Sequence, residues 1–140
     1  MIIADSGFWI ALGNRRDRHH ERAVEMARNY SDEGFITTWP VLTEVVHILA
    51  NRVHVAQAGT FVRDISRGAS VVADLPENSL ARIDILMRRY ADLPMDLADA
   101  SLVVLAEELE DGRILSTDAR DFAGYRWKNR RPFHNLLLDQ

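Results

Sequence analysis

The chain contains no cysteine, which excludes a disulfide scaffold and a zinc site built on thiolates. It has only four prolines and seven glycines among 140 residues, and no segment rich in either, so we expect a single domain spanning residues 1–140. Its apolar runs are far shorter than the roughly 20 residues of a membrane-spanning helix. Met1 leads directly into an apolar segment rather than a signal peptide. We therefore expect a cytoplasmic protein with no membrane partner.

Positive charge is also scarce, since the formal net charge is −4. An acidic balance argues at first against a nucleic-acid partner. The basic residues are nevertheless clustered, with Arg15, Arg16 and Arg18 early in the chain and Arg126, Lys128, Arg130 and Arg131 late. Basic rims beside an acidic site would give this distribution, and so would ordinary solvated surface charge.

Short apolar segments alternate with segments of helical periodicity along the whole chain. The expected strands cover residues 1–4, 35–38, 69–75, 113–117 and, as a possible fifth, 134–138. The expected helices cover residues 17–30, 40–52, 56–66, 77–90 and 97–109, the last with Asp96 as its N-cap. This alternation predicts an α/β fold with a central, mainly parallel sheet of four or five strands flanked by helices.

Four acids stand among apolar neighbours: Asp5, Glu44, Asp99 and Asp118. A carboxylate in such surroundings is costly unless a partner compensates it. Asp5 and Asp118 each follow a predicted strand, at the sheet edge where α/β proteins bind ligands. Simpler roles stay open for all four. Asp5 and Asp118 could cap a helix or open a turn, and Glu44 could lie on a helix surface. Asp99 could share the capping of its helix with Asp96, although its apolar neighbours favour a functional role.

Four carboxylates with no cysteine, and no histidine pair at zinc spacing, offer only hard oxygen ligands, which suit Mg²⁺ or Mn²⁺. Such ions activate water for attack on phosphate and neutralise developing charge. Ser6 and Thr117 would orient a carboxylate or a water, or simply cap a helix.

The same acids lie in segments that resemble the four motifs of the PIN-domain family of metal-dependent ribonucleases, most closely the VapC-type toxins of toxin–antitoxin systems. The segments are Asp5-Ser6, Thr43-Glu44-Val45, Asp99-Ala100-Ser101-Leu102 and Leu115-Ser116-Thr117-Asp118-Ala119-Arg120-Asp121-Phe122. The resemblance implies a three-layer PIN-like fold, a homodimer, Mg²⁺ or Mn²⁺ in an acidic pocket, RNA cleavage, and an antitoxin that covers the pocket. It carries Asp5, Glu44, Asp99 and Asp118 over as catalytic metal ligands, with Asp96 and Asp121 as accessory acids.

Several further residues have two interpretations. Arg15, Arg16, Arg126 and Lys128 would contact RNA phosphates or lie in solvated turns. Around them, Tyr125 and Trp127 would stack on bases or form part of a surface loop. We assign no role to His19 and His20, and we expect Trp9 and Trp39 in the core or at a dimer contact.

Three other functions remain open at this level. One is a PIN-like nuclease outside toxin–antitoxin systems, acting in RNA processing. Another is a non-catalytic module that binds RNA or protein. The last is phosphoryl transfer through an Asp5 nucleophile, as in haloacid dehalogenase-like enzymes. Those enzymes require a second Asp two residues after the nucleophile, and this chain has Gly7 at that position.

Overall fold

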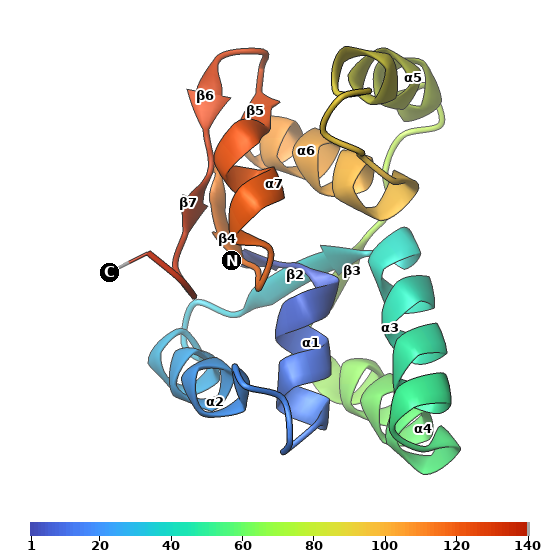
Figure 1. The fold of residues 1–140 in the computed structure, drawn as a ribbon, viewed down its shortest axis with the longest axis vertical. Helices are drawn as coiled ribbons and strands as arrows, with labels where there is room; N and C mark the ends of the chain where they lie inside the picture. The colour runs from blue at the N-terminus through green and yellow to red at the C-terminus, as the bar shows by residue number, and fades with distance from the viewer. Residues whose placement is uncertain (140) are drawn as a thin grey trace.

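Five short parallel strands form the central sheet of the computed structural model, which describes residues 1–139 (Figure 1). Their order across the sheet is β3 (Val71–Ala73), β2 (Phe35–Thr38), β1 (Ile2–Ala4), β4 (Arg113–Leu115) and β7 (His134–Asn135). Each neighbouring pair is parallel. The chain winds outward from β1 in one direction and then from β4 in the other, so the strand order reverses between β1 and β4. The predicted parallel α/β sheet is therefore confirmed, and its ligand-binding edge is expected beyond the ends of β1 and β4.

Helices cover both faces of this sheet, with α1 and α2 on one side and α6 and α7 on the other (Figure 1). The helical segments are α1 (Ser6–Gly13), α2 (His20–Asn29), α3 (Trp39–Arg52), α4 (Val55–Asp64) with the π-helical turn η1 (Ile65–Ala69), α5 (Ser79–Arg89), α6 (Leu97–Leu109) and α7 (Ala119–Gly124). A separate antiparallel hairpin is formed by β5 (Arg126–Trp127) and β6 (Arg131–Pro132). The layers match the predicted three-layer arrangement.

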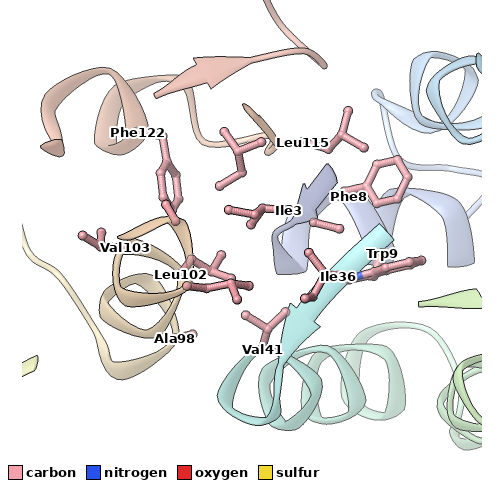
Figure 2. Close-up of a cluster of buried hydrophobic side chains, with 14 of the residues drawn as sticks. Ile3, Phe8, Trp9, Ile36, Val41, Ala98, Leu102, Val103, Leu115 and Phe122 are labelled. Atoms are coloured by element: carbon pink, nitrogen blue, oxygen red, sulfur yellow. The ribbon is translucent and has the colours of Figure 1, made fainter. Parts of the chain in front are cut away.

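The hydrophobic core lies on both sides of β1, whose three residues are all buried, as is usual for a central parallel strand. Figure 2 shows Phe8 and Trp9 of α1 on one side of the strands and Leu102 of α6 with Phe122 of α7 on the other. Helix α6 is buried from Ala100 to Ala106, and Asp99 in its first turn is a charged residue directly beside this apolar stretch. None of the helices in residues 1–139 has the length and apolar character needed to cross a membrane.

Element boundaries differ from the predictions mainly at turns. The predicted helix 17–30 begins only at His20, because the Asp17 carboxylate accepts the His19 N–H and closes a turn first. The strand predicted over 113–117 ends at Leu115, and the next three residues form the turn into α7. Neither α7 nor the β5–β6 hairpin was predicted.

The two tryptophans expected in the core or at a dimer contact separate in the structure. Trp9 is buried, which confirms a core position. Trp39, at the start of α3, is 60% exposed and donates its Nε1–H to Asp74 at 3.2 Å. A core role for Trp39 is therefore wrong.

Candidate functional site

Asp5 occupies the junction between β1 and α1 and is the most constrained of the predicted acids. Only 5% of its surface is exposed, and its side chain caps α1. Its Oδ1 accepts the Ser6 N–H at 2.7 Å and its Oδ2 accepts the Ser116 hydroxyl at 2.8 Å. Burial raises the pKa of Asp5 to about 6 despite these hydrogen bonds, and the charges of Glu44 and Asp118 add to the rise.

Glu44 reaches the same place from α3. The Ser6 hydroxyl donates to Glu44 Oε1 and also lies 3.3 Å from Asp5 Oδ1, so Ser6 bridges the first two acids. Burial raises the pKa of Glu44, and the charge of Asp96 raises it further. The half-buried position agrees with the predicted site role and is not that of a fully solvated helix residue.

Asp96 and Asp99 form a reciprocal capping box at the start of α6. Asp96 Oδ1 accepts the Asp99 N–H at 2.8 Å, and Asp99 Oδ2 lies 3.4 Å from the Asp96 nitrogen. The predicted N-cap at Asp96 is thus confirmed. Burial, followed by the charges of Asp96 and Asp5, raises the pKa of Asp99 to about 8. Capping alone does not account for Asp99. A capping carboxylate that faces solvent would keep its charge without the desolvation that raises the pKa of Asp99.

Asp118 and Asp121 stand in the turn after β4 and in the first turn of α7. Asp118 Oδ1 caps the helix by accepting the Asp121 N–H at 3.0 Å. Burial and the neighbouring Asp118 raise the pKa of Asp121 to about 6. Both acids therefore belong to the same electrostatic group as Asp5 and Asp99.

Ser116 connects the two strand ends and was not among the predicted site residues. It is fully buried, donates to Asp5 Oδ2 and accepts the Asp118 N–H at 2.9 Å. Asn135 of β7 holds it in place, with Nδ2 donating to the Ser116 carbonyl at 3.0 Å. The only signal in the sequence is a polar residue directly after a buried strand.

Thr117, which was predicted to support the acids, instead packs against α1. A Cβ added at Gly7 would overlap the Thr117 hydroxyl and stand 3.0 Å from its Cβ. Position 7 therefore has no room for the second Asp that haloacid dehalogenase-like phosphoryl transfer requires. That alternative is not supported by the structure.

Gly7→Ala should lower the free energy of unfolding by about 1–3 kcal/mol, because the overlap with Thr117 outweighs the better helix propensity of alanine. The matched control is Gly59→Ala in α4, where a Cβ meets nothing within 4 Å. It should raise stability by roughly 0.5–1 kcal/mol. Chemical denaturation of both variants measures the difference, and equal effects of the two substitutions would contradict it.

Six carboxyl groups from the starts of α1, α6 and α7, from α3 and from the β4–α7 turn thus meet at the predicted sheet edge, where burial and neighbouring charges raise the pKa values of Asp5, Glu44, Asp99 and Asp121. Within residues 1–139, no three His, Asp or Glu side chains already stand in an arrangement that would hold an ion. The donors are all hard oxygens, the type of ligand that Mg²⁺ and Mn²⁺ prefer. Binding one would require the side chains to move closer together.

The predicted RNA-binding residues lie at the far end of α1 and in the segment after α7. Arg15 and Arg16 are exposed beyond the far end of α1, roughly 12 Å along the helix from Asp5. Lys128 pairs with Glu110 at 2.6 Å, and Arg126 Nη1 donates to the Ala123 carbonyl at 2.8 Å.

The aromatic rings between these basic residues are not available for stacking on bases. Tyr125 and Trp127 are both buried in the hydrophobic core. The structure favours the surface-loop interpretation of this segment, with its backbone organised as the β5–β6 hairpin.

Comparisons with known proteins agree with this geometry. The chain is 25% identical over 125 residues to Ribonuclease VapC26 of Mycobacterium tuberculosis. The aligned region covers 89% of this chain and 92% of that protein. The crystal structure of Mycobacterium tuberculosis VapC20, described as a Sarcin-Ricin loop cleaving toxin, superposes with a TM-score of 0.76 at 19% identity over 94% of this chain and 100% of that one. The family model of the PIN domain matches residues 2–128, a range that includes all the acids described above. This chain belongs to the PIN domain family.

Proposed function

We propose that this protein, acting as one domain, is an endoribonuclease toxin of a toxin–antitoxin pair that hydrolyses RNA with the help of Mg²⁺ or Mn²⁺. The observation that carries the proposal is the convergence of Asp5, Glu44, Asp99 and Asp118 at the β1–β4 edge, where burial and the charges of neighbouring acids raise the pKa values of Asp5 and Asp99. The relatives, a ribonuclease and a Sarcin-Ricin loop cleaving toxin, support the same activity class.

A divalent ion held by Asp5, Glu44, Asp99 and Asp118 would activate a water and stabilise negative charge on the scissile phosphate. The protein contributes the order of its carboxylates. Asp5 has a donor on each oxygen, so its orientation is set before any ligand arrives. Glu44 is held on one oxygen by Ser6. Asp96 and Asp121 add negative charge around the four ligands.

We further propose that the protein is a cytoplasmic homodimer whose antitoxin inhibits it by covering the acids. A hollow of about 590 Å³ beside Glu44 and Asp96 carries the exposed apolar side chains of Trp39 and Leu97. Apolar side chains exposed at the margin of a charged site are typical of a surface that another protein covers.

Purified protein should cleave RNA in Mg²⁺ or Mn²⁺ and lose that activity in EDTA. Asp5→Asn should reduce cleavage at least about 100-fold, because removing one charged ligand weakens binding of the ion and disturbs the orientation of the remaining carboxylates. Asp84→Asn is the matched control, since Asp84 is an exposed α5 residue paired with Arg88. Equal cleavage with Mg²⁺, with EDTA and by Asp5→Asn would rule out this proposal.

The toxin role has its own test. Expression of the protein in bacteria should arrest growth, and expression of Asp5→Asn should not. Cleavage in vitro without growth arrest would instead favour a PIN-like nuclease of RNA processing, and metal-independent RNA binding without cleavage would favour a non-catalytic module.

A further inference from the structure

Tyr125 follows α7 and holds its ring in a cluster of aromatic side chains. It is completely buried. Its ring makes edge contacts with Tyr90 at 5.1 Å and with Phe122 at 5.3 Å between centroids. Phe122 in turn packs on the apolar side of the sheet opposite α1 (Figure 2). With two edge-to-face neighbours and no solvent, the ring has little freedom to move.

The hydroxyl of this ring points at the acids. It lies 3.3 Å from Asp99 Oδ2 and 3.0 Å from the carbonyl oxygen of Pro94. Its one proton is shared between two acceptors, of which the Pro94 carbonyl is the nearer and the Asp99 carboxylate, once deprotonated, is the stronger. Burial and the charge of Asp99 raise the pKa of Tyr125, so the hydroxyl remains a donor at any pH at which the protein works.

Asp99 has little else to hold that oxygen. Its other contact on Oδ2 is the Asp96 N–H at 3.4 Å, so this contact and the 3.3 Å contact from Tyr125 are both longer than a usual hydrogen bond. By contrast, Asp5 has donors at 2.7 and 2.8 Å on its two oxygens. The buried phenol therefore supplies a restraint that the capping box alone does not.

We propose that Tyr125 is a positioning residue of the site, whose hydroxyl restrains the Asp99 carboxylate within the group of acids that would bind a divalent cation. The catalytic consequence rests on the proposed function, whereas the contact itself does not. Since Tyr125 is buried, it acts on the substrate only through Asp99.

The test compares Tyr125→Phe with Tyr90→Phe. Both remove one hydroxyl from the same aromatic cluster, Tyr125 fully buried and Tyr90 half-buried. The Tyr90 hydroxyl accepts the Arg126 N–H at 2.9 Å and makes no contact with Asp99. Tyr125→Phe should lower kcat for RNA cleavage about tenfold with KM unchanged, and weaken binding of Mn²⁺ alone by a similar factor. Tyr90→Phe should change kcat and Mn²⁺ affinity by no more than about twofold, even if it lowers the melting temperature as much as Tyr125→Phe does.

An independent measurement separates this inference from the proposed function. The carboxyl carbon resonance of Asp99, followed by NMR in metal-free protein at one alkaline pH, should move in Tyr125→Phe and stay in place in Tyr90→Phe. If the wild-type protein cleaves no RNA but the two variants still differ in this resonance, the proposed nuclease function is wrong and the Tyr125–Asp99 contact is supported. An unmoved Asp99 resonance in Tyr125→Phe, or equal losses of Mn²⁺ affinity in both variants, overturns the inference.

Discussion

Asp99→Asn is expected to melt at a higher temperature than the wild-type protein in EDTA at pH 9 and yet to lose nearly all RNA cleavage. Asp99 is charged at that pH, because burial and the charges of Asp96 and Asp5 raise its pKa only to about 8. Asparagine keeps the shape and the acceptor oxygen of the capping box and removes the charge. The gain should be on the order of 2 kcal/mol after allowing for the solvent that reaches this half-buried group, which corresponds to several degrees in melting temperature.

The raised pKa of Asp99 also makes the stability of the wild-type protein depend on pH. An unfolded Asp carboxyl titrates near 3.8 and the folded Asp99 near 8, so between these values the folded state binds more protons. Stability without metal should therefore fall as pH rises from about 4 to about 8. Asp5 contributes in the same direction up to about pH 6.

Melting temperatures measured in EDTA from pH 5 to pH 9 provide the test. Asp99→Asn should show a flatter profile than the wild type, and the surface control Asp84→Asn should follow the wild-type curve. A wild-type protein that becomes more stable over this range, or an Asp99→Asn variant that melts below it at pH 9, contradicts the pKa assignment. Loss of cleavage, measured on the same samples in Mg²⁺, should reach at least about 100-fold.

The acids most readily predicted from sequence were those placed by local rules. Asp5 and Asp118 follow short buried strands, and the order of strands in a parallel sheet brings such positions together. Asp96 was identified as an N-cap because an acid before a long apolar helix has a local reason to be there. Glu44 depended on family resemblance, and its contact with Ser6 shows why, since that bond joins residues 38 positions apart.

Ser116 escaped prediction for the same reason on a larger scale. Its hydroxyl meets a carboxylate 111 residues away, and nothing in the local sequence distinguishes it from Thr117. Thr117 faces Gly7 instead, which only the packing of α1 against the β4–α7 turn decides. The choice between adjacent hydroxyls is made by which face of the turn points inward.

The region after β4 was the least predictable part of the fold. Helix α7 has six residues, too few for apolar periodicity to emerge. In the hairpin that follows, basic residues alternate with Tyr125 and Trp127, a pattern that also fits an exposed RNA-binding loop. The burial of Tyr125 depends in part on Tyr90, an aromatic partner at the end of α5, far away in the sequence.

Adding Mg²⁺ or Mn²⁺ to metal-free protein should raise its melting temperature, by an amount that increases as pH rises from 5 to 8. Carboxylates must be deprotonated to bind an ion, and the raised pKa values of Asp5 and Asp99 keep them largely protonated at the acid end of this range. At the alkaline end the ion both gains its ligands and relieves their repulsion. A hundredfold excess of ion over its dissociation constant should stabilise the fold by about 2.7 kcal/mol.

Thermal melts with increasing Mg²⁺ or Mn²⁺ at pH 5 and pH 8, against NaCl of equal ionic strength, separate binding from simple screening of surface charge. Asp5→Asn should reduce the metal-dependent shift at pH 8, and Asp84→Asn should leave it unchanged. A shift of equal size at both pH values, or one reproduced by NaCl, would mean that the ion acts on surface charge in general. In that case no bound cation would relieve the repulsion among the six acids. The melting temperature of the wild-type protein would then still fall toward alkaline pH at high concentrations of Mg²⁺ or Mn²⁺.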